Sequence, residues 1–240
     1  MKLIATFTVL SLVILSACNK EPVTTSTINS KPKADGSGKG GGNTTTGLIQ
    51  SVLSGNAARL IAGTTDSIWV SFTQPAPPGG WVLNLTSSNP GAAQVASTHV
   101  VPAGQRSAQP HVTGGQITNA TTATITVRLN TETKSTTIKV FPLTATFPAP
   151  PLQSPGNNKT FKPREIVDFT WAGNNNAYYY QLQIANNSSF TNPETDLLLN
   201  DPFWRQSAFS GLTLYWRVRY VAAGGGSGPW SEVRTFSIKQ

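Results

Sequence analysis

Short alternating runs of apolar and polar residues, broken by Gly and Pro, dominate the chain from Leu48 onward. Alternation with a period of two places every second side chain on one face of an extended strand. The runs SIWVSF, WVLNL and TITVRL each carry such an apolar set, and IKV closes the series: Ile68, Val70 and Phe72; Trp81, Leu83 and Leu85; Ile125, Val127 and Leu129; Ile138 and Val140. Because no stretch keeps a helical period, this pattern predicts an all-β fold of short strands.

A second group of alternating runs begins at Val167. Its apolar sets are Val167, Phe169 and Trp171; Tyr180, Leu182 and Ile184; Leu214, Trp216 and Val218; Phe236 and Ile238. The segment FPLTATFPAPPLQSPGNN, which lies between the two groups, contains five prolines and is typical of a stiff boundary. The pattern therefore predicts two tandem β-sandwiches that fold as separate units.

The N-terminal part of the chain has a different pattern. Leu3 to Leu15 is almost continuously apolar and follows the single positive charge of Lys2. A run of about 13 residues is shorter than the roughly 20 that a transmembrane helix needs, and it is typical of a secretory signal. The residues from Asn19 to Gly47 are rich in Gly, Ser, Thr and Lys and contain no aromatic residue. They cannot form a core, so we expect a disordered, flexible tether.

Cys18, the only cysteine of the 240 residues, ends the apolar run. The sequence Leu15, Ser16, Ala17, Cys18 resembles the lipobox of bacterial lipoproteins. That resemblance implies that a diacylglyceryl group is attached to the thiol and that cleavage leaves Cys18 as the new N-terminus. The alternative is a free cysteine buried as a small apolar residue. With a single cysteine, no intramolecular disulfide can form in the folded part.

Two longer stretches resemble known sandwich families. The phrase QPAPPGGWVLNLTSSNPGAAQV, followed by VPAGQRSAQPHVTGG and TTATITV, resembles a bacterial immunoglobulin-like repeat over Leu48 to Phe141. The stretches VDFTW, YYQLQIANNSSF, LYWRVRY and GPWSEVRTFSI resemble a fibronectin type III domain over Pro150 to Gln240. Pro110 falls where the first pattern expects an alternating strand, so we expect an edge or a bulge there.

These observations predict a division of the chain into five parts. They are a signal peptide at 1–17, a lipidated N-terminus with its tether at 18–47, an immunoglobulin-like sandwich at 48–141, a Pro-rich linker at 142–149 and a fibronectin type III-like sandwich at 150–240.

Charge and candidate chemistry favour a protein without catalysis. The net charge is +8, but Lys and Arg are spread along the chain without a basic stripe, which argues against a nucleic-acid partner. The two histidines, His99 and His111, and the ten acidic residues show no spacing typical of a catalytic or metal site. The Gly-rich pieces lack the strand and helix context of phosphate loops. We therefore expect no enzymatic activity, no cofactor and no bound metal.

The phase of the second group predicts an exposed face. If Tyr180, Leu182 and Ile184 point inward, their neighbours point outward, and the same holds for the strand around Trp216. In a fibronectin-like sandwich these two strands are neighbours, so six outward side chains form a candidate binding face: Tyr179, Gln181, Gln183, Tyr215, Arg217 and Arg219. The alternative is that they are cross-strand pairs that stabilise the sheet, with Trp230 stacking on an arginine. Trp69 is expected as an exposed aromatic on the first sandwich.

Two functions remain open from the sequence. The first is a lipid-anchored envelope protein, a monomer in the outer membrane and at the cell surface, that serves adhesion, protein interaction or spacing. The second is a glycan-binding accessory lipoprotein of a polysaccharide-capture system. Both use a β scaffold, which by itself does not fix function.

Overall fold

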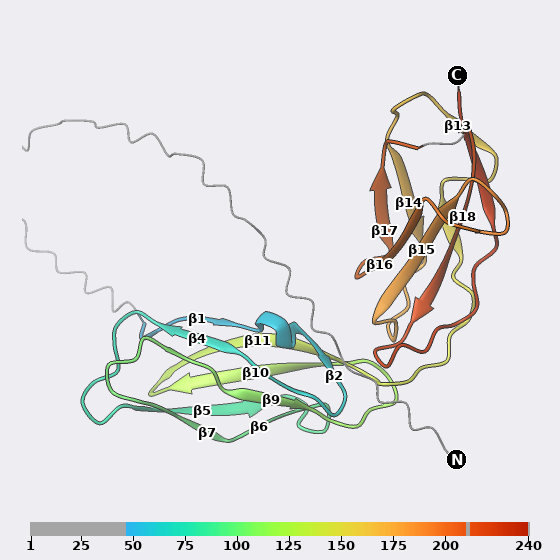
Figure 1. The fold of residues 1–240 in the computed structure, drawn as a ribbon. Coiled ribbons are helices and arrows are strands. Elements are labelled where there is room, and N and C mark those ends of the chain that lie inside the picture. Colours follow the sequence, from blue (N-terminus) through green and yellow to red (C-terminus); the bar gives the residue numbers. More distant parts are fainter. Residues whose placement is uncertain (1–46, 210–211, 240) are drawn as a thin grey trace, which may run out of the picture. The chain divides into compact units, whose positions relative to one another are not determined.

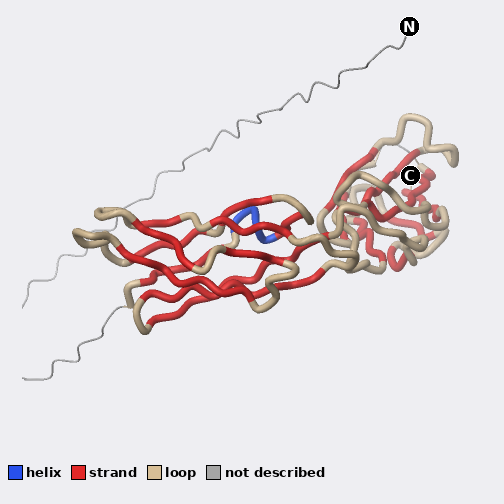
Figure 2. The backbone as a smooth tube through the Cα atoms, turned by 90° about the horizontal axis from the view of Figure 1, so that it is seen from below, coloured by secondary structure: helices blue, strands red, loops and turns tan. Residues whose placement is uncertain are grey.

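The computed structural model describes residues 47–209 and 212–239 (Figure 1). This part of the chain is all-β and forms two β-sandwiches, as the alternating pattern predicted. Strands dominate both sandwiches in Figure 2, and the one helix drawn there is a single 3-10 turn, η1 (Gly55–Ala58). The proposed signal peptide, Cys18 and nearly all of the proposed tether lie outside the described residues.

The first sandwich contains the strands β1 to β11. Their bounds are β1 (Ile49–Leu53), β2 (Arg59–Ile61), β3 (Thr65–Ser67), β4 (Trp69–Phe72), β5 (Trp81–Ser87), β6 (Ala93–Val95), β7 (Thr98–Val101), β8 (Ser107–Ala108), β9 (His111–Gly114), β10 (Thr121–Leu129) and β11 (Glu132–Phe141). One layer is the five-stranded sheet β2-β11-β10-β5-β7. The other consists of two short sheets, β1-β4-β8 and β3-β9-β6.

The second layer is split because two of its strands are interrupted at facing positions. Ile68 separates β3 from β4, and Pro110 lies between β8 and β9. The N–H of Ile68 donates to the carbonyl of Pro110 at 3.0 Å, whereas Pro110 has no N–H to donate in return. The strand is thus interrupted at Pro110, but β9 lies between β3 and β6 and is not an edge strand.

The inward residues of the first sandwich are those that the alternation predicted. Ile68, Val70, Leu83, Ile125 and Val127 have no measurable exposure. Trp81 is only partly buried, and its ring packs edge-on against that of Phe72 at 4.9 Å. Burial of about 25 cal/mol for each Å² of apolar surface makes this cluster the main stabilising contribution of the first sandwich.

The second sandwich contains the strands β12 to β19. Their bounds are β12 (Leu152–Ser154), β13 (Lys159–Phe161), β14 (Val167–Trp171), β15 (Tyr179–Ala185), β16 (Thr195–Leu199), β17 (Phe203–Gln206), β18 (Thr213–Val221) and β19 (Arg234–Ile238). One sheet has the order β12-β14-β17 and the other β13-β19-β18-β15-β16. The strands β12, β14 and β17 form one sheet, and the other strands form the sheet that faces it. Two sheets packed in this way are the arrangement of immunoglobulin and fibronectin type III sandwiches.

The core of the second sandwich is rich in aromatic rings. Phe169 packs edge-on against Trp216 at 5.2 Å and against Phe236 at 5.6 Å. Phe147, which the sequence assigned to the Pro-rich linker, is buried in this core and lies 5.5 Å from the ring of Tyr220. The packed part of the second sandwich therefore begins before Pro150.

The two sandwiches have separate hydrophobic clusters, but hydrogen bonds join them within one compact unit, Thr45–Gln240. The N–H of Ala120 donates to Oδ1 of Asn176 at 2.7 Å, and Nδ2 of Asn175 donates to the carbonyl of Ala120 at 3.1 Å. The independent folding of each sandwich remains a prediction.

Candidate functional site

The register of the second sandwich brings four of the six predicted face residues together. β15 and β18 pair antiparallel, as expected for neighbouring strands, and Gln181 lies opposite Arg219 while Gln183 lies opposite Arg217. Nε and Nη2 of Arg217 donate to Oε1 of Gln183 at 3.0 and 2.8 Å. Nε of Arg219 donates to Oε1 of Gln181 at 2.7 Å. In both cross-strand pairs, the arginine therefore donates to the side-chain oxygen of the glutamine.

A carboxylate from the next strand completes this network. Asp196 on β16 accepts a hydrogen bond from Nε2 of Gln181 on Oδ1 at 2.7 Å and from Nε2 of Gln183 on Oδ2 at 2.9 Å. Each arginine therefore donates to a glutamine, which donates to the same aspartate. The two guanidinium groups outnumber the one carboxylate, so the network carries a net positive charge.

Aromatic rings hold the arginines from the other side. The guanidinium carbon of Arg217 lies 4.0 Å from the ring centre of Phe190 and 4.1 Å from that of Trp230. The guanidinium carbon of Arg219 lies 4.5 Å from the ring centre of Trp230. We call these four residues the arginine–aromatic stack. Such contacts contribute about 0.5 to 2 kcal/mol each, depending on how far water is excluded.

The loop after β15 places Phe190 in the stack. Phe190 has a positive φ of 54°, an uncommon conformation for a bulky residue. Asn187 holds this turn, since its carbonyl accepts the N–H of Phe190 at 3.3 Å and its Oδ1 accepts the N–H of Thr191 at 3.0 Å. Phe190 is 6% exposed, so the turn directs the ring onto Arg217 and away from water.

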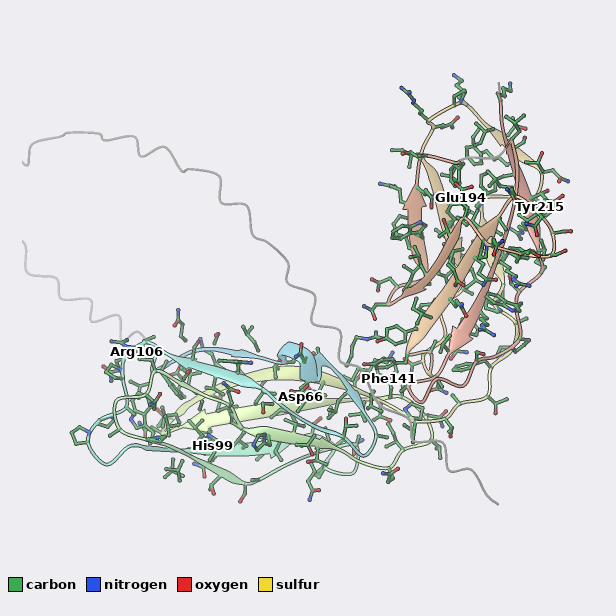
Figure 3. The ribbon with its side chains drawn as sticks, viewed as in Figure 1. Asp66, His99, Arg106, Phe141, Glu194 and Tyr215 are labelled. Carbon is green, nitrogen blue, oxygen red and sulfur yellow. The ribbon has the colours of Figure 1, made fainter. Side chains whose placement is uncertain are left out.

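The two tyrosines of the predicted face are far apart. Tyr179 pairs with Val221 and Tyr215 with Ala185, at opposite ends of the paired segment. The two pairs are six residues apart along the strand, so at about 3.3 Å for each residue they are separated by roughly 20 Å. Both tyrosines are partly buried, and Tyr215 is marked on the second sandwich in Figure 3. The six residues are therefore a central network with a tyrosine at each end.

Electrostatics within the stack act mainly on Arg217. Burial lowers its pKa, the charge of Arg219 lowers it further, and Asp196 opposes both effects. A guanidinium nevertheless keeps its proton in proteins, so Arg217 remains a cation at neutral pH. The exposed edges of the stack can offer fixed hydrogen-bond donors to an anionic or hydroxyl-rich partner. The same contacts are also those expected of cross-strand pairs that only stabilise the sheet.

Sequence reasoning missed two members of this arrangement, Phe190 and Asp196. Phe190 comes from a loop whose pattern says nothing about where its ring lies. Asp196 is a single acidic residue, and only the pairing of β15 with β16 places it opposite Gln183. Trp230, named from the sequence as a possible partner of an arginine, does lie on two of them.

A second polar site surrounds Arg59 of β2. Its guanidinium carbon lies 4.7 Å from the ring centre of Phe141 and 4.8 Å from that of Tyr178, and Nη2 donates to the carbonyl of Tyr178. A cavity of about 470 Å³ opens here, and its lining includes Asn56, Arg59, Asp66, Tyr178, Tyr179 and Asn200. Amide, carboxylate, guanidinium and phenol groups thus meet around one space, of which Tyr179 alone belongs to the predicted face.

A third site contains both histidines of the chain. His99 and His111 line a cavity of about 390 Å³ in the first sandwich, together with Gln94, Thr98 and Thr113. Burial lowers the pKa of His99, and the charge of His111 lowers it further. Among the described residues there is no group of three or more His, Cys, Asp or Glu that could hold a metal ion.

Two further observations concern the described residues. Trp69 is 49% exposed on β4, so the predicted exposed aromatic of the first sandwich is confirmed. The described residues contain no helix long and apolar enough to cross a membrane.

Comparison with known proteins finds similarity among solved structures. No family model and no curated protein matches the chain. The human OSCAR ligand-binding domain is similar at 15% identity and a TM-score of 0.39, over 77% of this chain and 94% of that one. Fibronectin(III)-like modules of CbhA from Clostridium thermocellum are similar at 12% identity and a TM-score of 0.32, over 80% and 93%.

An α-L-rhamnosidase from Dictyoglumus thermophilum is similar at 15% identity and a TM-score of 0.31. That match covers 39% of this chain, which spans only 12% of the rhamnosidase. The fold class therefore rests on the sheet order of this chain.

Proposed function

We propose that this protein is a non-catalytic, lipid-anchored protein of the bacterial envelope that presents its two sandwiches for adhesion or protein interaction. In this proposal Cys18 carries the lipid in the outer membrane, residues 19–47 hold the sandwiches away from it, and the protein acts as a monomer without a cofactor. The partner is a protein or a glycan at the cell surface.

The observation that supports binding most directly is the arginine–aromatic stack. Arg217 contacts two rings and donates two hydrogen bonds to Gln183, so its donors need little further ordering when a partner arrives. Preorganisation of this kind favours affinity because less side-chain entropy is lost on association. Arginine and aromatic residues are also the types that contribute most often to the energy of interfaces.

The experiment separates recognition from stability. Arg217 is not the tested residue, because its loss would remove contacts to both Phe190 and Trp230. Arg219→Gln removes one charge at the edge of the stack and leaves Arg217 on Trp230. The matched control is Arg205→Gln on the opposite sheet, where Arg205 is exposed and pairs with Asp168 at 2.6 Å.

Binding of the soluble mature chain to envelope glycans and to bacterial cells is measured beside its melting temperature. We expect Arg219→Gln to weaken binding by about tenfold, as for an interface residue of 1.4 kcal/mol, with the melting temperature lowered only by the loss of one cation–π contact. Arg205→Gln should bind like the parent. A lowered melt with binding intact would show that the stack only holds the sheet together.

The cavity at Arg59 favours a second candidate function, the capture of a glycan. Amide, carboxylate and guanidinium groups bind hydroxyls, and tyrosine offers both apolar area and a polar tip. Under this proposal Tyr179→Ala weakens the binding of soluble envelope polysaccharide. Tyr215→Ala, at the other end of the same face, leaves that binding unchanged, and equal effects of the two changes would contradict a site at this cavity.

A further inference from the structure

The chain has two histidines, and its fold brings both to one cavity. They lie twelve residues apart, at positions 99 and 111, on strands of different sheets. β6 pairs with β9 so that Val95 lies opposite Val112, which places His111 next to the end of β6. The chain then crosses to the five-stranded sheet and enters β7 at Thr98, one residue before His99. This crossing brings both histidine residues into the lining of the same cavity.

Each histidine has a different environment. His99 lies opposite Leu83, which is fully buried, so its side chain is on the inner face of the edge strand β7. His111 is exposed at the rim, and its Nδ1 lies 2.9 Å from Oγ of Ser67. When Nδ1–H donates to that hydroxyl, the lone pair of the ring is on Nε2. A hydrogen bond that fixes the tautomer and the ring in this way is the usual support of a metal-binding histidine.

We propose that His99 and His111 together bind one divalent transition-metal ion, Zn²⁺, Ni²⁺ or Cu²⁺. Imidazole suits these ions, whereas Ca²⁺ and Mg²⁺ need several carboxylate or carbonyl oxygens. The described lining of the cavity contains no Asp or Glu, so it does not match the harder ions. Two imidazoles fill part of the coordination shell, and water or the side-chain oxygens of Gln94 and Thr98 fill the rest.

The spacing of the two histidines explains why sequence analysis found no metal site. Short metal motifs place their ligands within a few residues on one turn or helix. Here the two ligands come from separate sheets, and their approach depends on the crossing between β6 and β7.

The test is calorimetric titration of Zn²⁺ and Ni²⁺ into the mature chain, with Cys18→Ser and without a histidine tag, so that no thiol or added imidazole competes. The variants are His99→Ala and His111→Ala, and the control is Thr133→Ala on β11. We expect the parent and the control to bind one ion per chain. Each histidine variant should lose roughly tenfold or more in affinity, because ligand loss exceeds the effect of losing an outer-shell partner.

A second readout guards against variants that simply unfold. Because the ion binds only the folded state, it should raise the melting temperature of the parent and of Thr133→Ala but of neither histidine variant. His111 is exposed, so His111→Ala should itself melt close to the parent. The proposal is overturned if no ion binds, if both variants bind as the parent does, or if only one histidine matters, since a single imidazole binds metal adventitiously.

Discussion

The guanidinium carbon of Arg217 lies 4.1 Å from the ring centre of Trp230 and 4.0 Å from that of Phe190. This relationship links a strand of the second sandwich to two loops, because Phe190 follows β15 and Trp230 precedes β19. Three parts of the chain that are distant in sequence thus meet on one charged group.

The first prediction follows from this stack. Trp230→Ala removes ring contacts to both Arg217 and Arg219, so we expect it to lower the free energy of unfolding by about 2 kcal/mol. Arg205→Ala is the control, since an exposed ion pair is screened by water and contributes little to stability. Urea unfolding of the mature chain measures both changes, and similar losses for the two variants would show that the stack adds little to stability.

The second prediction concerns Phe147 and the extent of the second sandwich. We expect a fragment of residues 144–240 to melt cooperatively, because it keeps every buried residue of the second cluster. Phe147→Ala in this fragment should cost about 3 kcal/mol through the cavity it leaves. The control Leu198→Ala, at a side chain that is 57% exposed, should change stability by less than about 0.5 kcal/mol. A fragment without a cooperative melt, beside a mature chain that has one, would rule out independent folding.

The third prediction concerns the lipid. Labelled fatty acid should enter the parent chain and be absent from Cys18→Ala, which should also accumulate as a longer precursor. The reason is that the thiol is the only group that can carry the thioether-linked diacylglyceryl implied by the lipobox resemblance. Mass spectrometry of the mature N-terminus checks the same point, and a mature chain that starts at any residue other than Cys18 would contradict it.

The fourth prediction uses Tyr220, which is 2% exposed and donates from its hydroxyl to the carbonyl of Ala172 at 2.7 Å. Burial raises the pKa of Tyr220, and the neighbouring Tyr180 raises it further. An unfolded tyrosine ionises near pH 10, so the stability that Tyr220 contributes is fully present below about pH 10. That stability is lost as the pH rises through the higher pKa of the folded state.

Tyr220→Phe should therefore cost about 1 kcal/mol at pH 7, from the lost hydrogen bond. Because the phenylalanine cannot ionise, the difference between parent and variant should shrink above about pH 10. Urea unfolding at a series of alkaline pH values measures this difference. Tyr215→Phe is the control at pH 7, where it should be nearly neutral, and a gap that widens with pH would contradict the burial argument.

Much of the fold could be predicted because strand alternation is a local property. Val167, Phe169 and Trp171 are buried as their period of two requires, and the pairing of β15 with β18 follows from the sandwich arrangement. The predicted face was harder, because alternation gives the side of a strand and not the partners of a side chain. It placed Gln183 outward, yet Gln183 is 9% exposed, since Arg217 and Asp196 cover it.

The sequence by itself determined the all-β class, the inward sets of both sandwiches and the exposure of Trp69, because each follows from the alternation of a few neighbouring residues. It also marked Pro110 as a place where a ladder hydrogen bond is lost, since proline has no N–H, but the strand after it is not the edge strand that was expected. Only the tertiary structure decided that Phe147 belongs to the second core, that Phe190 lies in the stack, that Asp196 completes the glutamine network, and that His99 and His111 line one cavity. These relations join residues from different strands and loops. They depend on register and on crossings between sheets, which no short stretch of sequence encodes.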